Sequence, residues 1–178
     1  MKTNAKIREE PLNQDERKVL LALQKNSKDS IHSIVKLCGF SRQKVQRILT
    51  QLEEDQVIWG YTAITDEKKQ GLLKYVLLIK RSMKKIDKET AEKIAFLQHD
   101  EEYVKQGITI ESSYLIHGEY DWMIFFTTQN LRDAKKFSTM LIENYPNIIA
   151  KVNLMQILHS PKTHHIRSPT PELLLDFL

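Results

Sequence analysis

Cysteine is almost absent from this sequence, and its scarcity excludes two kinds of site. Among 178 residues the only cysteine is Cys38, so neither an intramolecular disulfide nor a cysteine-based metal cluster can form. Cys38 falls on the apolar side of a predicted helix. A small buried hydrophobic side chain is the role we expect for it.

Long apolar runs are also missing. No stretch approaches the roughly 18 to 20 residues that a membrane-spanning helix needs, and the N-terminal residues lack the apolar core of a signal peptide. Apolar residues make up 41% and charged residues 28% of the chain, which is ordinary for a soluble globular protein. We therefore expect a cytoplasmic protein with one domain or two small ones.

Two short apolar patterns separated by a glycine predict a pair of helices in the first third of the chain. Each pattern has the i, i+3, i+4, i+7 spacing that places side chains along one stripe of a helix. They comprise Ile31, Ile34, Val35 and Cys38, then Val45, Ile48, Leu49 and Leu52. Gly39 can adopt the left-handed conformation that ends a helix, and Ser41 can cap the next one. Two helices joined by so short a turn indicate a helix-turn-helix.

The polar side of the second helix points to a partner. Residues near the start of a recognition helix meet base edges in the major groove of DNA, where arginine and glutamine make bidentate contacts. From Ser27 to Leu49 there are five basic residues and one acidic residue, a balance that favours a phosphate backbone. We predict these DNA-binding residues: Lys28, Lys36, Ser41, Arg42, Gln43, Lys44, Gln46 and Arg47. A solvated helix face is the alternative interpretation.

The predicted DNA-binding residues differ in role. Two arginines and two glutamines, Arg42, Gln43, Gln46 and Arg47, are expected to read bases or to position the helix. The three lysines are expected to neutralise phosphates. Arg47 could instead pair with Asp15 or Glu16 and brace the domain.

A further helix is expected ahead of this pair. Asn13 is a good N-cap, and Asp15 and Glu16 suit the positive end of a helix dipole. Its apolar stripe contains Val19, Leu20 and Leu23. This helix can close a three-helix core, without which two short helices could not bury enough apolar surface to remain ordered. Residues 12–58 are therefore assigned to a DNA-binding domain.

The segments outside the two domains are assigned as an N-terminal arm, a connection and a C-terminal tail. Residues 1–11 are expected to form a flexible arm, and its basic residues could also touch DNA. These are Lys2, Lys6 and Arg8. Residues 59–71 are assigned as a linking strand and connection, because β-branched and aromatic residues gather between Val57 and Asp66. Residues 159–178 form a tail whose three prolines predict irregular structure in its middle, before a last apolar turn of helix or a frayed end.

The second half, residues 72–158, predicts a domain with elements in the order β-α-β-β-α-β. The strands are expected at residues 72–82, 108–117, 122–128 and 148–158. The helices are expected to be capped by Asp87 and Asn130, and the polar segment 99–107 to be irregular. This order is that of the ferredoxin-like fold, four antiparallel strands with two helices on one face. The fold class is therefore α+β: an N-terminal three-helix, winged or helix-turn-helix domain joined by a linking strand to a C-terminal ferredoxin-like βαββαβ domain.

Both halves carry motifs with a known counterpart. The first half contains LNQDERKVL from Leu12, a GFS turn from Gly39, and LEEDQVIWGY from Leu52. The second half contains GEYD from Gly118. Together these motifs resemble the leucine-responsive regulator and asparagine-C (Lrp/AsnC) family of prokaryotic transcription regulators, over residues 12 to about 158. The start of the recognition helix departs from the family, whose members often have a proline there, and the segment 99–107 is longer than usual.

The resemblance implies a transcription regulator that binds double-stranded DNA. It implies a homodimer formed through the linking strand and the βαββαβ domain, which often assembles further, commonly into octamers. It also implies an amino acid or similar small-metabolite effector near the turn between the second and third strands. The candidate effector-binding residues are His117, Gly118, Glu119, Tyr120 and Asp121.

The sequence leaves three other interpretations to consider: an enzyme, a metal-binding protein and an effector-independent DNA-organising protein. Sirohaem decarboxylases resemble fusions of the same two domains, but their His-Asn-Tyr signature is missing, and Tyr120-Asp121-Trp122 stands there instead. His164 and His165 are adjacent in the tail without further ligands at metal-binding spacing. We therefore expect no enzyme activity, no catalytic residues, no metal and no cofactor. An effector-independent DNA-organising protein remains the third interpretation.

Overall fold

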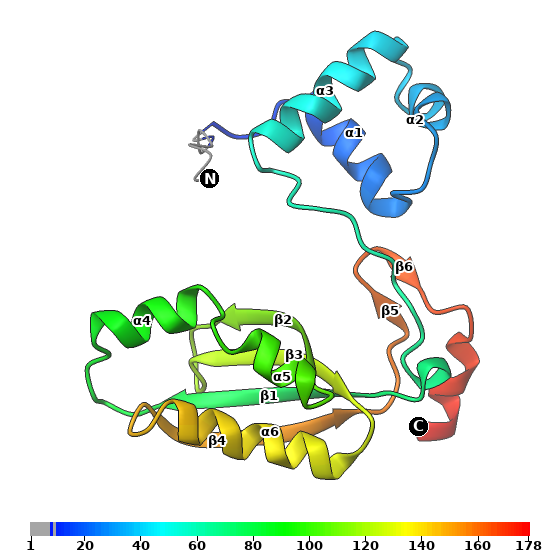
Figure 1. Ribbon diagram of the computed structural model, residues 1–178. Coiled ribbons are helices and arrows are strands. Elements are labelled where there is room, and N and C mark those ends of the chain that lie inside the picture. The colour runs from blue at the N-terminus through cyan, green and yellow to red at the C-terminus, as the bar shows by residue number, and fades with distance from the viewer. Residues whose placement is uncertain (1–7, 9) are drawn as a thin grey trace. The chain divides into compact units, whose positions relative to one another are not determined.

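The computed structural model describes Arg8 and residues 10–178 (Figure 1). The chain divides into two compact units. The first contains the described residues up to Ile64 together with Pro161–Leu178, and the second contains Thr65–Ser160. Lys2 and Lys6 of the predicted arm lie outside the described residues.

Three helices form the body of the first unit. They are α1 (Gln14–Lys25), α2 (Ile31–Cys38) and α3 (Arg42–Glu54). Asn13 caps α1 in a capping box with Glu16, and the Ser41 side chain accepts a hydrogen bond from the backbone N–H of Lys44 to cap α3. Gly39 has a left-handed backbone with φ of 67° and ends α2. These helix starts and stops are those that the sequence predicts.

The core of the first unit contains both predicted stripes. Its most buried members are Val19, Ile34, Cys38, Val45, Ile48 and Leu52. Cys38 is only 2% exposed, and burial raises the pKa of its thiol. The expectation that Cys38 is a core side chain is confirmed.

The segment after α3 differs from the prediction. Residues 57–66 form no hydrogen-bonded strand, and the N–H groups of Val57 and Ile58 both donate back to the carbonyl of Leu52. Trp59 is 95% exposed. A strand exists only when its backbone groups pair with a neighbouring strand, and no described strand pairs with this segment. The prediction of a linking strand is therefore wrong for the single chain.

The second unit is an antiparallel four-stranded sheet with helices on one face (Figure 1). Its elements are β1 (Leu73–Arg81), α4 (Lys88–Ala95), α5 (Asp100–Lys105), β2 (Thr109–Leu115), β3 (Trp122–Thr128), α6 (Leu131–Asn144) and β4 (Ile149–Ile157). The strands lie in the order β2-β3-β1-β4, which confirms the ferredoxin-like prediction. Alternate β1 residues Tyr75, Leu77 and Ile79 are buried under the helices.

The segment 99–107 contains a helix that the sequence did not predict. Tyr103 of α5 is 3% exposed and packs edge-on against Phe137 of α6, with ring centroids 4.9 Å apart. Its hydroxyl accepts a hydrogen bond from Asn144 Nδ2 at 3.1 Å. One buried aromatic side chain thus holds an otherwise polar helix on the core. The expectation of irregular structure is wrong here.

The tail also contains more structure than predicted. A hairpin of β5 (Lys162–Thr163) and β6 (Ile166–Arg167) occupies its middle, and a 3-10 helix, η2 (Pro171–Phe177), follows. The prolines flank the hairpin instead of interrupting it, and the Ser168 N–H donates to the Pro161 carbonyl at 3.0 Å. The prediction of an irregular middle is therefore wrong. His165 lines the same hollow as Trp59 in the first unit.

Candidate nucleic-acid interface

The start of α3 presents an exposed polar surface. Arg42, Gln43, Gln46 and Arg47 are all exposed, and the structure gives their side chains no hydrogen bond or ion pair with any described residue. The apolar residues of the same helix are buried in the three-helix core. Because the core fixes which side of α3 faces outward, these four side chains are available to a partner.

Lys44 differs from its neighbours, although it belongs to the same predicted set. Its Nζ lies 2.6 Å from Oδ2 of Asp15 and 4.2 Å from the centroid of the Phe40 ring. A carboxylate and an aromatic face both compensate an ammonium charge. Lys44 is thus partly neutralised by its own domain.

The remaining predicted DNA-binding residues are Lys28, Lys36 and Ser41. Lys28 is exposed ahead of α2, and Lys36 is exposed in the last turn of α2. The Ser41 hydroxyl oxygen accepts from the Lys44 N–H at 3.2 Å, so its first role is to cap the helix. A capped helix start leaves its other backbone N–H groups and positive dipole end facing outward, which suits a phosphate.

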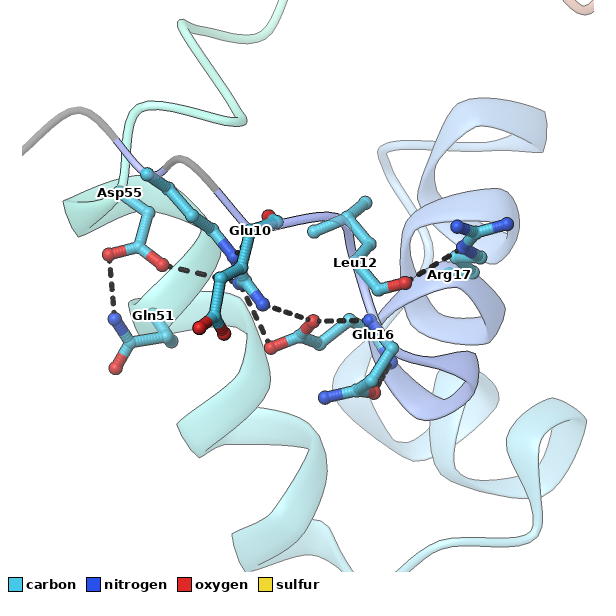
Figure 2. A network of polar contacts seen from close by, with 8 residues as sticks. Glu10, Leu12, Glu16, Arg17, Gln51 and Asp55 are labelled. Carbon is cyan, nitrogen blue, oxygen red and sulfur yellow. Dashed lines mark hydrogen bonds and ion pairs between the residues drawn. The ribbon is translucent and has the colours of Figure 1, made fainter.

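Arg8 joins the two ends of the helical domain. Its Nη1 and Nη2 donate to the two carboxylate oxygens of Glu16 at 3.1 and 2.9 Å, and Nη1 also donates to Oδ2 of Asp55 at 3.3 Å. Gln51 Nε2 donates to the other oxygen of Asp55 at 2.8 Å. Figure 2 shows Gln51 and Asp55 on one side of this contact and Glu16 of α1 on the other.

This network has two consequences for the predictions. The Arg8 guanidinium lowers the pKa of the Glu16 carboxyl, and Glu16 in turn raises the pKa of Arg8. Arg8, which the sequence places in the predicted arm, therefore contacts both α1 and the residue that ends α3. The bracing role considered for Arg47 belongs to Arg8 instead. No periodic pattern in the sequence marks Arg8, because its partners are 8 and 47 residues away.

The turn between β2 and β3 carries the predicted effector residues. His117, Gly118 and Glu119 are exposed. Tyr120 is half-buried, with Lys151 Nζ 5.6 Å from its ring centroid and Asn153 Nδ2 3.5 Å from its hydroxyl.

Asp121 is tied to the end of β1 rather than left free. Its Oδ2 accepts from the backbone N–H of Arg81 at 2.8 Å, and its own N–H donates to the carbonyl of Ile79 at 2.9 Å. Lys80 Nζ also lies 3.4 Å from the same carboxylate. The hydrogen bond from Arg81 is the main cause that lowers the pKa of Asp121. The structure thus brings the five turn residues together but gives this carboxylate a structural role.

The described part of the chain has neither a metal-binding cluster nor a membrane-spanning helix. No group of three or more His, Cys, Asp or Glu side chains among these residues could hold a metal ion. No helix among them is long and apolar enough to cross a membrane.

Comparisons with known proteins agree with the motifs and the topology. No family model matches the chain. An uncharacterized HTH-type transcriptional regulator of Bacillus subtilis, YugG, is 24% identical over 144 residues, which are 78% of this chain and 81% of that protein.

Two solved structures share the fold over most of both chains. An AsnC family transcriptional regulator from Agrobacterium tumefaciens has a TM-score of 0.63 at 20% identity, covering 91% of this chain and 99% of its own. A transcriptional regulator from Neisseria meningitidis, solved as a complex with L-methionine, has a TM-score of 0.64 at 19% identity, covering 92% and 99%. The chain therefore has the two-domain fold of the Lrp/AsnC regulators, the family that its sequence motifs resemble.

Proposed function

We propose that this chain is a sequence-specific DNA-binding transcription regulator of the Lrp/AsnC type. The observation that carries the proposal is the start of α3, where Arg42, Gln43, Gln46 and Arg47 are exposed and unpaired within the described chain. Arginine and glutamine at the start of such a helix are the side chains that read base edges in the major groove. The relative YugG and the Agrobacterium structure bear the names of transcriptional regulators. A regulator of this kind acts in the cytoplasm and needs no catalytic residues, and we assign none.

A homodimer is part of the proposal. The sheet face opposite the helices carries several apolar side chains that do not belong to the core under the helices. It carries Leu78, Tyr114, Met123, Phe125 and Met155. Tyr114 and Met155 are 45% and 42% exposed. An open apolar face of this kind is typical of an interface, and a two-fold dimer would place two α3 helices in successive major grooves about 34 Å apart.

We also propose that an amino acid or similar small metabolite regulates the assembly through the β2–β3 turn. The support is the GEYD motif and the L-methionine complex of the Neisseria protein. A ligand can change DNA binding only if it binds one assembly state better than another. Unchanged DNA affinity and sedimentation with every amino acid tested would leave an effector-independent regulator.

The test of DNA binding is selection of bound duplexes from a random pool by the full chain, with and without an amino-acid mixture that includes L-methionine. A pseudo-palindromic motif with half-sites one helical turn apart is the expected result. Arg42→Ala combined with Arg47→Ala should abolish enrichment, whereas Lys135→Ala, an exposed residue of α6, should leave it intact. Absence of any enriched motif, or equal enrichment by the double variant, would overturn the proposal.

A further inference from the structure

A cavity of about 330 Å³ lies in the second unit between the sheet and its helices. The sheet contributes Ile79, Ile110 and Ile124, the α4–α5 segment contributes Leu97 and Tyr103, and α6 contributes Leu141. Cavities of roughly 300 to 1,000 Å³ with mainly apolar walls are typical small-molecule sites. This one lies on the helix-covered side of the sheet, and the turn residues 117–121 do not line it.

One cation stands out among these apolar walls. Arg81, at the end of β1, lines the cavity, and its Nε hydrogen is buried without an acceptor among the described residues. A buried donor without an acceptor costs free energy, and that cost is larger for a charged group. Arginine stays charged when buried and offers a planar fork of donors that matches a carboxylate. The cavity therefore has an unsatisfied anion-binding group and a large apolar volume beside it.

Besides Arg81, the ionisable side chains that line the cavity are His99, Asp100, Tyr103 and Tyr145. Asp100 lines the cavity, and burial raises the pKa of its carboxyl, which favours the uncharged form. Burial also raises the pKa of Tyr145, to about 12, so its hydroxyl stays protonated. The protonated hydroxyl of Tyr145 can donate a hydrogen bond to an anion.

We propose that this cavity binds a small apolar carboxylate, held by Arg81, with its hydrocarbon or aromatic body among the aliphatic side chains of the sheet and helices. The site is separate from the proposed effector turn and does not depend on DNA binding. It uses the segment 99–107, because Tyr103 both anchors α5 to the core and forms part of the cavity wall.

The cavity is also connected to the β2–β3 turn through the backbone. Ile79 and Arg81 line it, and the backbones of both residues bond to Asp121. The Ile79 carbonyl accepts from the Asp121 N–H, and the Arg81 N–H donates to the Asp121 carboxylate. The side chain of Arg81 would hold the ligand carboxylate, and the backbone N–H of the same residue donates to the Asp121 side chain in the turn. The proposed carboxylate site therefore lies beside the end of β1 that holds the turn in place.

The test measures binding of 3-phenylpropanoate to the full chain by titration calorimetry. Three matched probes accompany it: 3-phenylpropan-1-ol lacks the charge, 3-phenylpropylamine reverses it, and L-phenylalanine adds an ammonium group to the same skeleton. Saturable binding of the acid, at least tenfold tighter than that of each probe, is the expected result. Equal or tighter binding of L-phenylalanine, the alcohol or the amine, or no binding of the acid, would overturn the proposal.

Variants locate the site. Arg81→Met should weaken binding of the acid at least tenfold, and Arg132→Met, the same change at an exposed residue of α6 outside the cavity, should not. Ser113→Phe places a ring in the cavity from an exposed β2 position and should also weaken binding at least tenfold, even if Arg81→Met proves unstable. Unchanged affinity in Ser113→Phe or in a folded Arg81→Met protein would refute the site. DNA binding by the ligand-free chain is measured in parallel, so failure of either proposal is seen separately.

Discussion

Tyr103 offers the sharpest test of how the segment 99–107 is held. The helix α5 is only six residues long and has acidic residues over its first turn, so it is too short to be stable by itself. What holds it is one ring, 3% exposed and packed edge-on against Phe137. Removal of that ring should therefore detach the helix.

The expected magnitudes follow from burial. Tyr103→Ala removes a fully packed aromatic side chain, for which losses of about 3 to 5 kcal/mol are usual. Tyr103→Phe keeps the ring and removes only the hydrogen bond from Asn144, which should cost about 0.5 to 1.5 kcal/mol. Because Asn144 is half-buried and its amide can bond to water instead, the lower end is expected. Val104→Ala, at the next position but 57% exposed, should change stability by less than about 0.5 kcal/mol.

Urea unfolding followed by tryptophan fluorescence measures these differences. A Trp59→Phe background leaves Trp122 as the only tryptophan, and Trp122 packs against the core of the same unit as Tyr103. A loss below about 1 kcal/mol in Tyr103→Ala, or a loss in Val104→Ala as large as that in Tyr103→Ala, would contradict the packing described for α5.

Three further predictions concern the helical domain. Arg47→Ala should weaken operator binding about 5- to 150-fold in a DNA titration and leave thermal stability nearly unchanged. Lys44→Ala should lower the unfolding free energy by up to about 1 kcal/mol, and it should weaken operator binding less than Arg47→Ala does. Because Arg8 lowers the pKa of Glu16, this pair stabilises the folded state at pH values above 4.5, the ordinary pKa of the carboxyl group. That stabilisation is lost as the pH falls through the lowered pKa of the folded state. The unfolding free energy of Glu16→Gln should therefore depend less on pH in an acid titration. Gly39→Ala should cost about 1 kcal/mol in denaturant unfolding, since its φ of 67° is unfavourable for alanine and no atom lies within 4 Å of the added methyl group.

Elements with regular spacing could be predicted from the sequence. The stripe on α3 and the cap at Ser41 each depend on residues that are close along the chain, and the alternation along β1 does as well. The predicted start of α3 and the predicted boundaries of β3 therefore agree with the structure. The same local rules predicted which face of α3 is exposed, and with it the candidate DNA-reading residues.

Contacts between distant residues could not be predicted in this way. Arg8 donates a hydrogen bond to Asp55, which is 47 residues away in the sequence, and no sequence pattern around either residue predicts this pair. Tyr103 and its exposed neighbour Val104 are the only apolar residues of the segment 99–107, so no periodic stripe revealed α5. The segment from Val57 has strand-forming side chains, but strand formation also needs a neighbouring strand, which composition cannot supply.

The two hydrogen bonds between Asp121 and the end of β1 change how variants of the GEYD motif should be interpreted. If Asp121→Asn abolished a metabolite response, the loss would not identify this carboxylate as a ligand contact, because the same change weakens the anchor of the loop. A variant at Glu119, which is exposed in that loop, separates the two explanations. If the Glu119 variant also loses the metabolite response, the turn contacts the metabolite directly. If only the Asp121 variant loses the response, the loss comes from a misplaced turn.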